Sequence, residues 1–265
     1  MKLRRVFLSI VLAGVPFAFV PAAGADATTP TTAPSTPSAM EPADVASPKL
    51  GKDGNMDAHF KTMHEKFLKR RSEGPIDVLF LGDSITEGWS GRGKALWEKN
   101  YAPLNAANFG IGGDRTQHVL WRIDNGELDG ISPKVLVLLI GTNNIGYEPA
   151  EILKADTKII QEIHDKLPQT KVLVLAIFPR GADPKGTDKK DENTATFREK
   201  IIEVNKGLAL LDDGNKTRFL DFGSKFLDDD NKIPKDIMPD ALHPNAKGYQ
   251  IWVDAMNPLL TEMLK

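Results

Sequence analysis

The chain has 265 residues, of which 41% are hydrophobic and 26% are charged, and its formal net charge is −2. These values are ordinary for a globular protein, so the chain can bury a core without structural metal or disulfide bonds. It contains no cysteine, which excludes a disulfide framework and lipid attachment of the bacterial lipoprotein kind. With a mildly acidic balance and no basic cluster, we expect no nucleic-acid partner.

The first 25 residues differ from the rest of the chain. Three basic residues stand at the start, namely Lys2, Arg4 and Arg5. An apolar run follows at residues 6–20 and small residues come after it, which is the order of a secretory signal peptide cleaved after Ala25 or Ala27. The alternative is an uncleaved membrane anchor, but the run is short for a span and contains Pro16. We therefore expect residues 1–25 to be removed, leaving a secreted or periplasmic chain of net charge −5 without stable membrane insertion.

Residues 26–49 are dominated by alanine, threonine, proline and serine. Such a segment cannot bury enough apolar area to offset the entropy lost on ordering, so we expect a disordered linker. The remaining residues, 50–265, contain no internal repeat and should form one domain.

Short apolar runs alternate with amphipathic patterns along this domain. The runs predict strands at residues 76–81, 106–109, 135–140 and 172–177, with a weaker one at 217–220. Apolar residues spaced by three and four predict helices at about residues 60–74, 114–124, 149–166, 193–211 and 245–263. Strands that are apolar on both faces and alternate with helices indicate an α/β fold, a three-layer α/β/α sandwich with a five-stranded parallel sheet. Active sites of such folds form beyond the carboxyl ends of the strands.

Ser84 follows the first predicted strand, in the sequence Gly82-Asp83-Ser84-Ile85-Thr86. Gly82 lets the backbone turn sharply, which would put Ser84 on the exposed turn before the next helix. A hydroxyl in that place can act as a nucleophile if a base lies near it. Taken alone, however, such a serine more often only caps a helix.

Two further segments offer hydrogen-bond donors. Three glycines in four residues, ending at Gly112 and Gly113, leave backbone N–H groups uncovered after the second strand. Asn143 follows the third strand, where its side-chain amide can donate to a developing oxyanion. A tight turn explains either segment equally well, so each is weak evidence by itself.

Asp240 and His243 precede the last predicted helix, and Pro244 suits its first position. A spacing of three lets the carboxylate hold one ring nitrogen while the other faces a hydroxyl. We interpret the other four histidines as surface or packing residues: His59, His64, His118 and His164. Nucleophile, donors and base would all meet at one edge of the sheet, and this combination predicts a serine ester hydrolase.

These motifs, in this order, resemble the four sequence blocks of the SGNH, or GDSL, hydrolase superfamily over residues 76 to about 260. Within it the chain looks most like the catalytic subunits of platelet-activating-factor acetylhydrolase IB and their secreted bacterial relatives, chiefly through residues 108–144 and 178–181. Residues 85–89 differ from the more apolar run that the subfamily has after the nucleophile, so the substrate of the subfamily is not transferred to this chain.

The resemblance implies a flavodoxin-like sandwich with Ser84 as nucleophile, His243 as base and Asp240 as the residue that orients it. The oxyanion hole would consist of the Ser84 N–H, the Gly113 N–H and the Asn143 amide, with Gly112 as the alternative donor. We also assign Asp83 and Asp114, which flank the nucleophile and the glycine pair, to substrate binding.

We therefore expect an acyl-enzyme mechanism without cofactor or metal, because no histidines and acids have metal-ligand spacing. Short connections without a long apolar lid favour small acyl groups such as acetyl, on a carbohydrate or a small extracellular ester. A lysophospholipid or platelet-activating-factor-like ester is the alternative substrate, and a non-catalytic carbohydrate-binding module is the alternative function. The oligomeric state stays open.

Overall fold

The computed structural model describes residues 40–181 and 192–265, and Glu41–Lys265 form one compact unit. The predicted signal peptide and the first part of the predicted linker lie outside the described residues. Within the described part of the chain, no helix combines the length and the apolar character needed to span a membrane.

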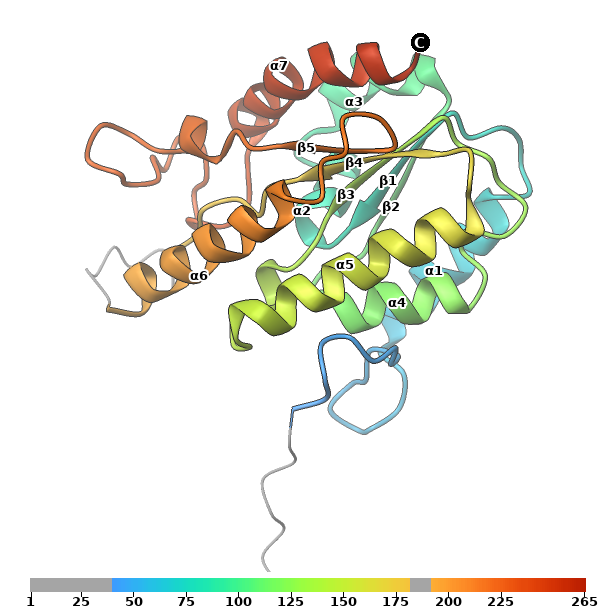
Figure 1. Cartoon of the computed structure of the whole chain (residues 1–265), viewed down its shortest axis with the longest axis horizontal. Coiled ribbons are helices and arrows are strands. Elements are labelled where there is room, and N and C mark those ends of the chain that lie inside the picture. Colours follow the sequence, from blue (N-terminus) through green and yellow to red (C-terminus); the bar gives the residue numbers. More distant parts are fainter. Residues whose placement is uncertain (1–39, 182–191) are drawn as a thin grey trace, which may run out of the picture. The chain divides into compact units, whose positions relative to one another are not determined.

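A single parallel sheet occupies the centre of this unit (Figure 1). Its strands are β1 (Val78–Gly82), β2 (Ala106–Gly110), β3 (Val135–Leu139), β4 (Lys171–Leu175) and β5 (Thr217–Leu220). Their order across the sheet is β2-β1-β3-β4-β5, and every neighbouring pair is parallel. The predicted five-stranded parallel sheet is confirmed. Because β1 lies between β2 and β3, the segments that follow these three strands emerge side by side.

Helices pack on both faces of the sheet (Figure 1). One apolar core receives side chains from α1 (Ala58–Arg70), α4 (Thr116–Asp124), α5 (Pro149–Lys166) and α6 (Glu192–Ala209). The other receives them from α2 (Ser84–Glu87), α3 (Lys94–Asn100) and α7 (Ala246–Met263). The three-layer α/β/α architecture follows.

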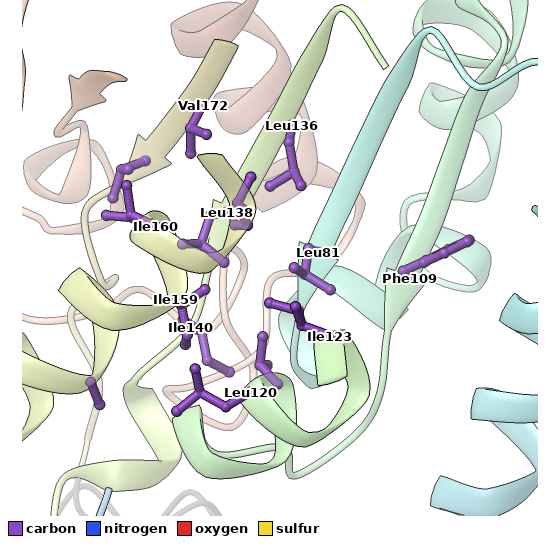
Figure 2. Packing of buried hydrophobic residues seen from close by; sticks show 14 of the residues in the cluster. Leu81, Phe109, Leu120, Ile123, Leu136, Leu138, Ile140, Ile159, Ile160 and Val172 are labelled. Atoms are coloured by element: carbon purple, nitrogen blue, oxygen red, sulfur yellow. The ribbon is translucent and has the colours of Figure 1, made fainter. Parts of the chain in front are cut away.

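Alternating side chains of each strand supply the two cores, because successive residues of a strand point to opposite faces. Leu79 and Leu81 belong to the core beneath α4 and α5, which Figure 2 shows from close by. Val78 and Phe80 belong to the opposite core, where the rings of Trp89 and Trp252 are fully buried. This double burial explains why the strands are continuously apolar in sequence.

The helix that follows His243 begins later than the sequence indicated. Pro244 was expected in its first position, but α7 begins at Ala246 and Asn245 caps it by accepting from the N–H groups of Lys247 and Gly248. That prediction was wrong: a helix that began at Pro244 would have His243 at its cap, whereas the Asn245 side chain caps a helix that begins two residues later. His243 therefore lies in the turn before the helix.

Residues 41–57, which we call the N-terminal segment, pack against the domain. Its first part falls within the predicted linker, yet Ala43 is only 1% exposed. Thr116 Oγ1 donates to the Ala43 carbonyl at 2.7 Å, and Tyr147 Oη donates to the Glu41 carbonyl at 2.6 Å. The boundary expected at residue 50 must therefore move to about residue 41, because the domain supplies partners for the segment's backbone.

Candidate active site

Ser84 lies at the start of α2, directly after β1, with its side chain partly exposed. Gly82, at the end of β1, has no room for a side chain, because a Cβ atom there would lie 2.2 Å from the Leu139 carbonyl oxygen of the neighbouring β3. Asp83 caps the helix by accepting from the Ile85 N–H at 2.9 Å. Tyr249, which lies 164 residues further along the sequence in α7, donates its Oη hydrogen to the Ile85 carbonyl at 2.7 Å and so links α7 to α2. The serine is thus presented on a firmly held turn.

Asp240, His243 and Ser84 form one connected row. The Ser84 Oγ atom lies 2.9 Å from His243 Nε2, and His243 Nδ1 lies 2.7 Å from Asp240 Oδ2. The other carboxylate oxygen of Asp240 accepts from the backbone N–H groups of Leu242 and His243, at 3.1 and 2.7 Å. Ala241 adopts a left-handed backbone, φ 55°, which closes this turn. The structure therefore brings together the three residues that the sequence selected as nucleophile, base and orienter.

The Asp240 carboxylate is stabilised in its ionised form. Burial tends to raise its pKa, but the hydrogen bonds from the His243 N–H, the His243 ring and the Leu242 N–H together outweigh burial and lower the pKa overall. An ionised carboxylate beside Nδ1 favours the tautomer with the proton on Nδ1, which leaves Nε2 free to accept the serine proton. The arrangement can thus perform general-base chemistry.

The donors proposed for the oxyanion hole differ in whether they already have an acceptor. The backbone N–H groups of Ser84 and Gly113 have no acceptor among the described residues, and Gly113 is exposed with a left-handed backbone, φ 72°. The Gly112 N–H, in contrast, donates to Glu87 Oε2 at 2.6 Å. Asn143 donates one amide hydrogen to the Asp114 carbonyl at 2.8 Å, and its Nδ2 lies 3.5 Å from Asp83, a distance at the limit for a hydrogen bond.

Asp83 and Asp114, which we assigned to substrate binding, face the protein interior. Their exposed fractions are 1% and 0%, so neither can touch a substrate, and that assignment needs correction. Burial raises the pKa of each to about 7, although the positive charge of Arg122 opposes the rise. Asp83 caps α2, and Asp114 forms an ion pair with Arg122 at 3.0 Å. Both carboxyl groups therefore stabilise the structure of the site from the protein interior.

Arg122 is a structural residue of the site that sequence reasoning missed. Its guanidinium is fully buried and donates to the Phe109 carbonyl at 2.9 Å and to the Gly82 carbonyl at 3.1 Å, which links the ends of β2 and β1. It also pairs with Glu127 at 2.8 Å. A signal existed in the sequence, because an arginine among the apolar residues of an amphipathic helix is buried only when it is paired.

Arg180 was also missed, although its motif was noted. It is 8% exposed and donates to the Thr142 carbonyl at 2.9 Å, directly before Asn143. This contact fixes the turn that carries the Asn143 amide.

Three further polar residues surround the Gly112–Gly113 turn. Lys49 Nζ donates to the Gly112 carbonyl, and His59 Nε2 lies 2.9 Å from Glu87 Oε1. Lys49 and His59 come from the N-terminal segment and the start of α1, so no local pattern connects them with the serine.

Known proteins with similar sequences share this site-bearing region. The sequence model described as the GDSL-like Lipase/Acylhydrolase family matches residues 80–251. The human platelet-activating factor acetylhydrolase IB subunit alpha1 is 35% identical over 209 residues, which cover 78% of this chain and 85% of that protein. The rat alpha2 subunit is 34% identical over 221 residues, covering 83% of this chain and 91% of that protein.

Solved structures show the same fold. A GDSL-like lipase from Bacteroides thetaiotaomicron superimposes with a TM-score of 0.60 at 17% identity, and the match covers 75% of this chain and 97% of that one.

Proposed function

Since the chain belongs to the GDSL-like lipase/acylhydrolase family and is a carboxylic ester hydrolase, we propose that it removes short acyl groups, acetyl above all, through an acyl-enzyme on Ser84. One observation carries the proposal: the unbroken row from Ser84 Oγ through His243 to Asp240, with separations of 2.9 and 2.7 Å. A hydroxyl, an imidazole and a carboxylate in that order are the parts that nucleophilic acyl transfer requires.

In the first half-reaction His243 Nε2 takes the proton of Ser84 while Oγ attacks the ester carbonyl carbon. Asp240 stabilises the imidazolium that forms. The tetrahedral oxyanion accepts hydrogen bonds from the N–H groups of Ser84 and Gly113 and from the Asn143 amide. When the C–O bond to the alcohol breaks, His243 returns the proton to the departing oxygen. Water then attacks the acyl-enzyme in the same manner, and the acid leaves as Ser84 regains its proton.

The free N–H groups favour Gly113 over Gly112 as the backbone donor. The Gly112 N–H is already bonded to Glu87, whereas the N–H groups of Ser84 and Gly113 have no acceptor among the described residues. A donor left unpaired in the resting protein is available for charge that develops in the transition state. Each such donor contributes about 3 kcal/mol of transition-state stabilisation in comparable hydrolases.

The acyl preference has two supports. The relatives at 34–35% identity are named acetylhydrolases. The connections that carry Ser84, Gly113 and Asn143 are short, which suits a shallow site and a small acyl group.

For the alcohol we propose a carbohydrate or a small extracellular molecule. A platelet-activating-factor-like acetyl ester is the second candidate, because the relatives carry that name.

A fluorophosphonate probe tests the nucleophile. We expect one covalent adduct on Ser84, detected by mass spectrometry, that disappears in Ser84→Ala and persists in Ser224→Ala, an exposed serine elsewhere. An adduct that survives Ser84→Ala would refute the assignment.

Turnover of model esters tests the acyl group. We expect kcat/KM for p-nitrophenyl acetate to exceed that for p-nitrophenyl palmitate, and faster cleavage of the palmitate would refute the acetyl preference. Acetylated oligosaccharides and acetyl phospholipids, compared at equal concentration, then separate the two alcohol classes.

We also propose that residues 1–25 are a signal peptide. The exported protein should begin at Asp26 or Thr28, which N-terminal sequencing from a culture supernatant measures. A protein that stays in the cells with Met1 in place would contradict this.

A further inference from the structure

Both polar groups of the Gly112 backbone are held by charged side chains. Its N–H donates to Glu87 Oε2 at 2.6 Å, and its carbonyl oxygen accepts from Lys49 Nζ. Lys49 belongs to the N-terminal segment, 63 residues earlier in the chain. We call the pair Lys49 and Glu87 the Gly112 clamp.

The clamp acts on the peptide that carries the proposed oxyanion donor. The carbonyl of Gly112 and the N–H of Gly113 belong to the same peptide unit, and in a trans peptide these two groups point in opposite directions. Lys49 therefore fixes the direction of the Gly113 N–H by holding the carbonyl on the other side. The Lys49 ammonium lies close by, since a Cβ atom on Gly113 would be 2.9 Å from its Nζ.

A peptide between two glycines needs such a restraint. Glycine has no Cβ, so the rotations on either side of this peptide are almost unhindered, and Gly113 already has a left-handed φ of 72°. If the peptide turned over, it would present a carbonyl oxygen where the N–H had been, and that oxygen would repel an oxyanion instead of binding it. The two glycines that expose the Gly113 N–H thus also leave the direction of this N–H without steric restraint.

The charges of the clamp suit this task. Lys49 is partly buried and has no carboxylate within 4 Å among the described residues, so the Gly112 carbonyl is its one described acceptor. A cation on the carbonyl polarises the peptide and makes its N–H a stronger donor. On the other side Glu87 is itself held by His59, at 2.9 Å. The peptides on both sides of Gly112 are consequently held by charged side chains.

We propose that Lys49 and Glu87 are positioning residues for the oxyanion hole: they lock the Gly112–Gly113 turn so that the Gly113 N–H faces the reacting carbonyl. This inference rests on the proposed function, since it assumes that Ser84 is the nucleophile and Gly113 a donor. It adds the N-terminal segment to the parts of the chain on which turnover depends.

The decisive variant is Lys49→Met, which keeps the length and apolar stem of lysine but removes the ammonium. We expect kcat for p-nitrophenyl acetate to fall about 10- to 100-fold, less than the full loss of a donor, while KM changes less than about threefold. Lys49→Arg keeps a charged donor and should recover most of kcat. Lys52→Met, an exposed lysine in the same segment, is the matched control and should equal the wild type.

Glu87 provides a second, independent variant that decides the matter if Lys49→Met does not fold. Glu87→Gln keeps an oxygen that can accept the Gly112 N–H and should retain most of kcat. Glu87→Ala removes the acceptor and should lose kcat about 10-fold or more at unchanged KM. Thermal unfolding of each variant, followed by circular dichroism, establishes that the loss does not reflect an unfolded protein.

The outcomes separate this inference from the proposed function. Turnover that survives in Ser84→Ala removes the proposed function itself. If Ser84→Ala is inactive but Lys49→Met matches Lys52→Met within threefold, the clamp alone is refuted. A rise in KM without loss of kcat in Lys49→Met would likewise refute it, because the lysine would then bind substrate and not position a donor.

Discussion

Replacement of Asp240 by asparagine separates the electronic role of this residue from its structural role. Asp240 Oδ1 accepts the N–H groups of Leu242 and His243, and the asparagine oxygen can keep both bonds. The new amide nitrogen would then stand 2.7 Å from His243 Nδ1, where the carboxylate oxygen stood. An N–H beside Nδ1 forces the ring proton onto Nε2, which faces Ser84 and can no longer accept its proton.

The expected effect on turnover is large and the effect on folding is small. The corresponding substitution in a well-studied triad lowers kcat about 10⁴-fold, or about 5.5 kcal/mol at 1.36 kcal/mol for each factor of ten. We expect a loss of similar size for Asp240→Asn, measured as kcat on p-nitrophenyl acetate, with urea unfolding within about 1 kcal/mol of wild type. Asp236→Asn, whose carboxylate is 65% exposed and pairs with Lys247, is the matched control. If Asp240→Asn retains more than a tenth of wild-type kcat, the tautomer argument fails.

Three further predictions concern the buried frame of the site. Because burial raises the pKa of Asp83 from 3.8 to about 7, the folded state binds this proton more tightly than the unfolded state, and stability falls as pH rises through that window. Between pH 5 and pH 8, about two pH units of that window are crossed, so Asp83→Asn should remove up to about 3 kcal/mol of the fall, measured by urea unfolding at both pH values; an unchanged difference between the two pH values would contradict it. Arg122→Met leaves Asp114 and Glu127 buried without the guanidinium that pairs with both, and it should cost about 3–5 kcal/mol in urea unfolding, so a variant within 1 kcal/mol of wild type would count against the network. Gly110→Ala places a Cβ atom 2.1 Å from the Glu87 nitrogen and should cost about 3 kcal/mol, whereas Gly146→Ala points into open space and should be silent; equal melting temperatures for both would refute the packing argument.

The sheet was predictable because its strands are short, continuously apolar and separated by turn residues. The predicted run at residues 135–140 corresponds to β3 (Val135–Leu139), and 217–220 matches β5 as observed. The short helix α2 was not predictable, since four residues show no periodicity. It exists because Asp83 caps it and because Tyr249, from the far end of the chain, bonds to its backbone.

The row of three side chains was predictable for a topological reason. Ser84 follows a strand, and Asp240 and His243 precede a helix, so a parallel sheet brings all three to one edge. The direction in which the side chains of the neighbouring Asp83 and Asp114 point was not predictable in this way. Asp83 and Asp114 stand next to residues that a substrate would approach, but their side chains turn inward to a helix cap and to a buried arginine. Sequence adjacency determines where a backbone lies, while burial depends on partners that lie elsewhere in the chain.

The N-terminal segment yields a last prediction on the same grounds. Its composition suggests disorder because it brings little apolar area. The segment is nevertheless ordered by hydrogen bonds in both directions: Tyr147 and Thr116 of the domain donate to its backbone carbonyls, and its own Lys49 donates to the Gly112 carbonyl. A chain that begins at residue 50 should therefore fold, since both cores draw almost all of their side chains from later residues, but should lose kcat to the level of Lys49→Met. A chain that begins at residue 41 should match the full-length protein. Equal kcat for the two truncated chains, with equal circular dichroism spectra, would show that the segment covers the site without contributing to turnover.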